Sequence, residues 1–385
     1  MTLERGKNQQ ALKENVIDSG LCTGCGACVG LCPYQEGWHD RIVTLHPCDL
    51  AEGRCYAYCP RTPLDVTALR QALSPGGEWL PECGPVRAFY VTQATDEGVR
   101  LRSQHGGTVT ALLRLALEEG LIDEAIVTTA DEGLLPDGKE ATDVAGLEKT
   151  GGSRFPVSPV LALFNRRARI SGGPIGVVTT PCQGLALARM RQKPLPDAGD
   201  PIDRLGLVIG LFCGWALDWR KLRDVFKGRI DLRCITGMDI PPSQYHRLDV
   251  YTTHGTVSIS LDEVIPCVRP SCLACTDMTS EWSDLSVGAA RLPGGWEEAR
   301  AWNQVIVRTE RGEKLIAMAK ARGVLRFREV PAGAMEKLKK AAANKKRAGV
   351  ATLAQKSGRP EDLIYLDPTD PLIAPFCSGQ VETEV

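Results

Sequence analysis

Apolar runs of strand length alternate with helix-length amphipathic segments through the middle of this 385-residue chain. The runs at 175–182 and 205–213 are apolar almost throughout, which is typical of parallel strands buried on both faces. Strands and helices alternate from 160 to 230, as in the repeated βαβ units of a parallel sheet. The pattern at 247–260 predicts a hairpin that turns at His254 and Gly255. Further strands are predicted at 86–92, 124–129 and 302–309, and helices at 63–73, 111–119, 183–191, 218–226 and 313–322.

The cysteine content of the chain indicates that it binds metal. The chain has 15 cysteines, and a chain of this length does not need disulfides to fold, so metal binding is the more economical use for them. The N-terminus has no apolar signal core, and the longest apolar run is shorter than a membrane span and contains glycines. We therefore expect the protein to lie in the reducing cytoplasm and to have no membrane-spanning segment. A net charge of -1 gives no general reason to bind nucleic acid.

Four cysteines near the N-terminus, the last of which is Cys32, follow the C-x2-C-x2-C-x3-C-P spacing of bacterial ferredoxins. If the ferredoxin crossover holds, Cys22, Cys25 and Cys28 bind one [4Fe-4S] cluster together with a cysteine of the next motif, Cys59. A structural zinc site is the alternative, although zinc sites favour two separated pairs of ligands.

The second motif reads C-x6-C-x3-C-P and is one cysteine short of the usual pattern. The crossover leaves Cys32, Cys48 and Cys55 for the second site. Three thiolates suit a [3Fe-4S] cluster. The interpretation preferred here is a [4Fe-4S] cluster whose fourth ligand is Cys83, Asp49 or another group.

A third thiolate site is predicted around the Cys-x-x-Cys pair formed by Cys272 and Cys275. Cys182 and Cys213 each follow one of the two buried parallel strands, and such strands end on the same edge of a sheet. We therefore predict a [4Fe-4S] cluster held by these four cysteines. The alternatives are a redox-active Cys-x-x-Cys pair or scattered buried cysteines, and Cys267 competes as a ligand.

Glycines and hydroxyls in segment 103–110 precede a predicted helix. Unpaired N–H groups and the helix dipole make such a loop an anion cradle, in which a flavin pyrophosphate would fit. An ordinary turn is the alternative, and His105 alone is more often a surface or capping residue than a proton donor. A second loop, with Ser153 and Arg154, either clamps a phosphate or is an ordinary loop.

Segments 103–113, 180–183, 209–213, 270–277 and 284–312, in this order, resemble the family of the coenzyme F420 hydrogenase/dehydrogenase beta subunit, preceded by its frequent ferredoxin-like N-terminal 4Fe-4S domain. The resemblance covers most of the chain. It implies FAD and a [4Fe-4S] cluster in the large domain. It also supports Cys182, Cys213, Cys272 and Cys275 as the ligands of that cluster. The implied FAD contacts are Ser103, Gln104, Gly106, Gly107, Thr108, Thr110, Ser153, Arg154, Ser158, Asp277 and Gly288.

The expected architecture is a small ferredoxin-like α+β iron–sulfur domain followed by a larger α/β flavin-binding domain with a mixed, mainly parallel sheet. The polar lead spans 1–17, the iron–sulfur domain 18–73 and a Gly/Pro-rich linker 74–85. The large domain spans 86–330, and 331–385 form a C-terminal helix and tail. The helix is rich in lysine, which is typical of a solvated face, although it could dock an acidic partner.

The function that the resemblance implies is that of an oxidoreductase subunit that is an iron–sulfur flavoprotein. It would relay electrons between a catalytic partner, such as a hydrogenase or formate dehydrogenase, and FAD. FAD would exchange a hydride with coenzyme F420 or a similar organic acceptor. One alternative is a stand-alone reductase of a tetrapyrrole or other organic substrate fed by soluble ferredoxin, and another is a flavin-free electron-wiring subunit.

Overall fold

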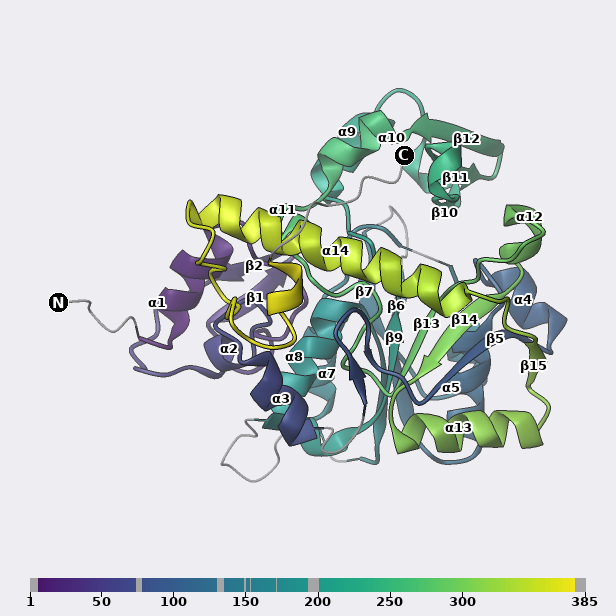
Figure 1. Cartoon of the computed structure of the whole chain (residues 1–385), viewed down its shortest axis with the longest axis horizontal. Helices are drawn as coiled ribbons and strands as arrows, with labels where there is room; N and C mark the ends of the chain where they lie inside the picture. Colours follow the sequence, from purple (N-terminus) through teal and green to yellow (C-terminus); the bar gives the residue numbers. More distant parts are fainter. Residues whose placement is uncertain are drawn as a thin grey trace.

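The computed structural model describes residues 6–73, 78–129, 135–148, 150–152, 154–170, 172–192 and 201–377. Its body is an eight-stranded sheet of order β15-β5-β14-β13-β9-β8-β6-β7 (Figure 1). Strands β6, β8, β9 and β13 pair in parallel at the centre, and the outer strands pair antiparallel. This confirms the α/β class and the mixed sheet. The strands are β5 Ala88–Ala94, β6 Glu124–Thr129, β7 Asp137–Ala141, β8 Ile175–Thr179, β9 Leu205–Leu211, β13 Leu285–Ala289, β14 Asn303–Val307 and β15 Leu325–Arg328.

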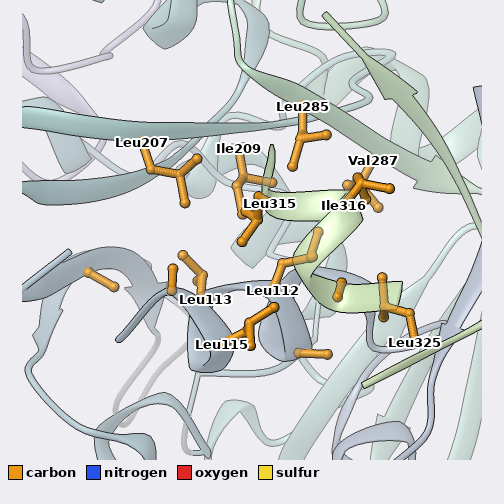
Figure 2. Close-up of a cluster of buried hydrophobic side chains, with 14 of the residues drawn as sticks. Leu112, Leu113, Leu115, Leu207, Ile209, Leu285, Val287, Leu315, Ile316 and Leu325 are labelled. Carbon is orange, nitrogen blue, oxygen red and sulfur yellow. The ribbon is translucent and has the colours of Figure 1, made fainter. Parts of the chain in front are cut away.

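Helices cover both faces of the sheet. On one face α5 (Thr108–Glu118) and α13 (Glu310–Ala321) pack their leucines against the strands (Figure 2). On the other face lie α7 (Val160–Arg167) and α8 (Pro181–Gln192). Successive side chains of β9 serve opposite faces, because Leu207 and Ile209 join the first cluster while Val208 joins the second. Burial on both faces explains why the central strands are nearly continuous apolar runs.

A smaller antiparallel sheet carries its own core above the main sheet (Figure 1). It contains β10 (Ile235–Asp239), β11 (Arg247–Thr252) and β12 (Gly255–Ser260), and it packs with α9 (Trp219–Phe226) and α10 (Leu261–Val264). The pairing of Thr252 with Gly255 confirms the predicted hairpin.

The N-terminal cysteine-rich segment packs directly on α7 and α8. The Asn165 side-chain amide on α7 donates to the carbonyls of Ala27 and Val29, at 3.1 and 2.7 Å. A Cβ on Gly26, whose φ is +84°, would lie 2.7 Å from the Ala162 nitrogen. Glycine therefore permits this close approach. The segment contains α1 Gln9–Leu12, the π-helix η1 Lys13–Ile17, β1 Gln35–Trp38, β2 Arg41–Thr44, α2 Arg54–Ala57 and α3 Val66–Leu73.

The C-terminal helix α14 (Ala334–Ser357) runs along the molecule from the sheet to the N-terminal segment (Figure 1). It is not simply a solvated helix, because one face, which includes Leu338, Lys346 and Leu353, is buried. In the parts of the chain that the structure describes, no helix is long and apolar enough to cross a membrane. The other elements are β3 Trp79–Leu80, β4 Gly84–Pro85, α4 Glu97–Arg102, α6 Val144–Glu148, α11 Pro270–Leu273, α12 Trp296–Ala299 and the 3-10 turns η2 Pro201–Arg204, η3 Leu232–Cys234, η4 Ser243–Tyr245, η5 Ile265–Cys267 and η6 Ala374–Phe376.

The expected linker at 74–85 is described from residue 78 onward, and residues 74–77 lie outside the described part. The strands β3 and β4 pair antiparallel there. Trp79 packs against Trp282 with ring centroids 4.8 Å apart. This stretch is therefore attached to the main body.

Leu112→Ala should destabilise the fold because Leu112 is fully buried between α5 and the sheet. We expect the free energy of unfolding to fall by about 2 to 5 kcal/mol, from lost burial and the cavity left behind. Leu101→Ala is the matched control, since Leu101 on α4 is 80% exposed, and should change stability by less than about 0.5 kcal/mol. Anaerobic urea unfolding measures both variants, and equal losses would contradict the assignment of this core.

Candidate functional site

Four cysteines meet beyond the carboxyl ends of the central strands. Parallel pairing of β8 with β9 brings Thr179 opposite Gly210, so Cys182 and Cys213 follow at the same edge of the sheet. Cys272 and Cys275 approach from the loop around α11. Burial raises the pKa of the Cys213 thiol well above its usual value, and the neighbouring thiols of Cys272, Cys182 and Cys275 raise it further. The four thiols therefore form one group, called here the inner group.

The inner group has the four thiols that an iron–sulfur cluster uses as ligands. Among the described residues, no three His, Cys, Asp or Glu side chains converge closely enough to hold one metal ion. A cubane occupies the space between its ligands, so its four thiolates stand farther apart than ligands of one ion. An all-thiol donor set is the one that [4Fe-4S] clusters use.

A second set of thiols, called the first N-terminal group, contains Cys22, Cys25, Cys28 and Cys59. Burial raises the pKa of Cys59, and the next largest cause is the nearby thiol of Cys25, with Cys22 also contributing. The pKa of Cys28 is likewise raised by burial and then by Cys22, Cys25 and Cys59. The structure thus brings together the four cysteines that the ferredoxin crossover predicts.

Cys32, Cys48 and Cys55 form the second N-terminal group. Burial raises the pKa of Cys55 to about 11, with Cys32 as the next cause and Cys48 as a further one. The structure does not place Cys83 with them, because the groups that shift its pKa after burial are Arg308, Glu281, Glu82 and Lys346. Cys83 is therefore not brought to this group as a fourth ligand.

Cys267 is also separate from the thiol groups. It is buried in the core of the smaller sheet, and its sulfur lies 3.8 Å from the Glu263 carbonyl. Burial raises the pKa of Cys267, and the next causes are Lys221, Asp218 and Asp224, so its electrostatic surroundings differ from those of the thiol groups although Cys272 packs against the same core.

The three groups lie in series. Cys55 of the second N-terminal group raises the pKa of Cys28 in the first group. Burial raises the pKa of Cys182 in the inner group to about 12, and Cys25 of the first group is the next cause. Cys213 of the inner group lines a cavity. The thiol groups therefore lead from the exposed Cys32 to that cavity.

The cavity has a volume of about 560 Å³ and opens where α5 begins. Its wall combines this helix start with the ends of β8, β9 and β13 and with residues of β10 and α14. Gly107 precedes α5 with a φ of +76°, in the left-handed region that favours glycine. The expected FAD contacts that lie in this wall are Ser103, Gln104, Gly107, Thr108, Thr110 and Gly288.

Three buried polar atoms in this wall have no hydrogen-bond partner among the residues that the structure describes. They are Oε1 of Gln104, Nδ1 of His105 and Oγ1 of Thr179. Buried polar groups are normally hydrogen-bonded, so such atoms point to a polar ligand or bound water. A flavin, with polar ring edges and a diphosphate, fits this mixture of orphaned polar atoms and apolar wall.

His105 and Asp239 lie together at the cavity. Burial lowers the pKa of His105, and the charge of Asp239 opposes this shift. Burial raises the pKa of Asp239, and the charge of His105 opposes that shift. The Gln104 amide donates to the Asp239 carboxylate at 2.5 Å. The His105 and Trp296 rings pack edge to face, with their centroids 5.6 Å apart. His105 is thus a cavity residue, not the surface residue that its sequence context favours.

Five expected FAD contacts do not appear in the described cavity wall. Gly106 packs behind it, where a Cβ would lie 2.9 Å from the Asn303 side-chain oxygen. Arg154 is partly buried, and the Ser158 carbonyl accepts a hydrogen bond from Gln183 at 2.7 Å. Asp277 instead accepts from the backbone N–H groups of residues 279, 280 and 281, at 2.8 to 2.9 Å, and thereby shapes the loop after Cys275. Ser153 lies outside the described residues.

Other wall residues were missed in the sequence. Gln183 directly follows Cys182, and its position in the Thr-Pro-Cys-Gln segment was the available signal. Asp239 carried no local signal, because only the smaller sheet brings it to the start of α5. Arg61 was also missed, although it lies within the cysteine-rich segment and reaches the inner group.

The chain is similar to known proteins over most of its length. Residues 89–165 and 173–332 match the models of the N-terminal and C-terminal parts of the coenzyme F420 hydrogenase/dehydrogenase beta subunit, and residues 15–35 match the 4Fe-4S binding domain. Over 313 residues the chain is 28% identical to a subunit of the F(420)H(2) dehydrogenase of Methanosarcina mazei, covering 79% of this chain and 84% of the relative. It is 29% identical to the coenzyme F420-dependent sulfite reductase of Methanocaldococcus jannaschii, covering 78% of this chain and 46% of that protein.

A solved structure is also similar. A chain of the F420-reducing [NiFe] hydrogenase complex from Methanosarcina barkeri superposes with a TM-score of 0.66 at 25% identity. The match covers 72% of this chain and 94% of that chain. The shared fold therefore extends over most of this chain.

Cys272→Ala should remove the cluster of the inner group and leave the N-terminal clusters in place. Iron should fall by about four atoms per chain, because one [4Fe-4S] cluster loses a ligand. Cys267→Ala, five residues away and with charged groups in place of thiols as its electrostatic neighbours, should keep the wild-type iron content. Anaerobic iron and acid-labile sulfide assays decide, and a loss in Cys267→Ala with none in Cys272→Ala would reverse the ligand assignment.

Proposed function

Because this chain belongs to the family of the coenzyme F420 hydrogenase/dehydrogenase beta subunit, we propose that it is an iron–sulfur flavoprotein that transfers electrons between a catalytic partner and coenzyme F420. The observation that carries the proposal is the series of three thiol groups ending at one cavity, with Cys213 in both the last group and the cavity wall. A stand-alone binding protein would have no use for such a series.

The N-terminal groups and the inner group would hold iron–sulfur clusters, and the cavity would hold FAD. When bound, the clusters supply single-electron exchange, and FAD supplies the conversion between single electrons and a hydride. The remaining contributions come from the protein. Its side chains keep the thiols buried, fix their spacing and exclude water from the cavity.

The start of α5 is the proposed anchor of the flavin. The helix has 11 residues, and its first turn presents the N–H groups and dipole that favour a diphosphate. One of these groups is already used, since the Thr108 N–H donates to the Asn303 side chain at 3.2 Å. Gln104 and Thr179 supply orphaned oxygens in the same wall. The apolar side chains of Leu113 and Phe212 would contact ring surface.

The two ends of the series are the proposed places where electrons enter and leave. At one end Cys32 is exposed, so the second N-terminal group is the proposed contact with a partner such as a hydrogenase or dehydrogenase subunit. Soluble ferredoxin is the alternative partner. At the other end the cavity would admit coenzyme F420, the coenzyme after which the relatives are named. Cysteines that serve as cluster ligands must stay free of disulfides, so the proposed function suits a reducing compartment such as the cytoplasm.

Two measurements on the full chain, purified without oxygen, test the proposal. About 12 iron atoms and one flavin per chain are expected from three cubanes and FAD, and about 11 iron atoms would favour a [3Fe-4S] second site. Reduced F420 should then be oxidised when a viologen dye accepts the electrons. Cluster-replete protein without extractable flavin would leave an electron-wiring subunit, and flavin-replete protein inert toward F420 would remove F420 as substrate.

Thr110→Trp should lower flavin content because Thr110 lines the cavity from α5 and an indole would occupy flavin space. We expect most of the extractable flavin to be lost while iron stays at the wild-type level. Glu118→Trp is the matched control on the same helix, where residue 118 is outside the cavity wall. Acid extraction and fluorescence measure the flavin, and undiminished flavin in Thr110→Trp would reject this cavity as its site.

A further inference from the structure

Arg61 extends from the cysteine-rich segment into the loop of the inner group. It follows Cys59 by two residues and is only 4% exposed. Its guanidinium donates to the Ser271 carbonyl at 3.3 Å, and its charge acts on the nearby Cys275 thiol. One side chain of the first N-terminal group's segment therefore reaches the Cys-x-x-Cys loop.

Tyr365, from the segment after α14, completes this contact. Arg61 donates to the Tyr365 hydroxyl at 2.8 Å, and that hydroxyl donates to the Ala274 carbonyl at 2.8 Å. Tyr365 is 3% exposed. Arg61 thus holds the loop just before Cys272, and Tyr365 holds it just before Cys275. These two side chains come from opposite ends of the chain.

A second arginine crosses in the opposite direction. Arg269 directly precedes α11 and donates to the Cys22 carbonyl at 3.3 Å. It also forms a buried ion pair with Asp40 at 2.7 Å. The first N-terminal group and the inner group therefore each receive an arginine from the other's segment, which fixes the two groups relative to each other.

The two arginines differ in how their charge is balanced. Asp40 neutralises Arg269. The described hydrogen-bond partners of Arg61 are a phenol and a carbonyl, and its charge acts on the inner thiols of Cys275 and Cys182. Where those thiols are the thiolates of a bound cluster, the buried charge of Arg61 acts on that cluster with little screening by water.

We propose that Arg61 is the positioning residue of the junction between the first N-terminal group and the inner group, and that its positive charge raises the reduction potential of the inner cluster. The inference rests on the proposed function, because it requires a cluster at the inner group. A nearby cation stabilises the more negative, reduced form of a cluster, and net charge, hydrogen bonds and exposure set cluster potentials. Lys345 adds to the effect, since it donates to the Cys272 carbonyl at 2.7 Å.

The test compares Arg61→Gln, which keeps hydrogen-bond donors without charge, with Arg61→Lys, which keeps the charge. Each full-length variant is purified without oxygen, its iron is counted, and its clusters are titrated by EPR at defined potentials. The inner signal is identified as the one absent from Cys272→Ala. Arg326→Met is the control, because Arg326 is exposed on β15 at the far edge of the sheet.

We expect Arg61→Gln to shift the inner midpoint potential in the negative direction and to shift that of the first N-terminal cluster less, because Arg61 is the leading charge beside Cys275 and also acts on Cys25. Arg61→Lys and Arg326→Met should stay close to wild type. Loss of the inner cluster from Arg61→Gln but not from Arg61→Lys would also support a requirement for the charge.

An unshifted inner potential in cluster-replete Arg61→Gln would overturn the inference, as would loss of the inner cluster from both variants, which is the result of a purely structural role. Tyr365→Phe separates the tyrosine contact from the charge and should retain the potential. Failure of the proposed function is distinguishable, because wild-type protein would then lack the third cluster and contain only about eight iron atoms.

Discussion

The close approach of the Cys-x-x-Cys loop to strand β9 is the constraint on which the site depends. A Cβ on Gly210 would lie 2.2 Å from the Ser280 hydroxyl. Only glycine at this position therefore lets the loop lie against the end of β9, just before Cys213. Asp277 folds that loop by accepting three backbone N–H groups. The parallel pairing of β8 and β9 then adds Cys182. Loss of any of these contacts would separate the thiols and open the cavity wall that they share.

Charge buried around the loop ties distant parts of the chain together. Arg308 is 1% exposed and donates to the carbonyls of Cys83, Pro85 and Thr279. Lys346 on α14 pairs with Glu281 at 2.6 Å. Burial raises the pKa of Glu281 to about 7, against the opposing effect of Lys346. Buried charges need such partners. The polar network therefore specifies how the β3–β4 hairpin and α14 meet the sheet, instead of adding general stability.

Local sequence patterns predicted the features that depend on interactions between residues close together in the sequence. The strand β6 was predicted with its observed bounds, and the hairpin between β11 and β12 and the convergence of Cys182 with Cys213 follow from apolar runs and turn chemistry. The inward face of α14 could not be predicted, because its lysines resemble those of a solvated helix until Lys345 and Lys346 meet buried partners. Likewise, Asp239 and Arg61 act through contacts far apart in sequence, for which periodicity gives no signal.

The contact between Arg61 and Tyr365 joins residues 304 positions apart. During synthesis Arg61 leaves the ribosome long before Tyr365. Until Tyr365 has been made, Arg61 lacks its hydroxyl partner, although the Ser271 carbonyl is already present in the chain. The junction between the two thiol groups therefore cannot form all its contacts until the segment after α14 has been synthesised, which makes its completion a late step of folding.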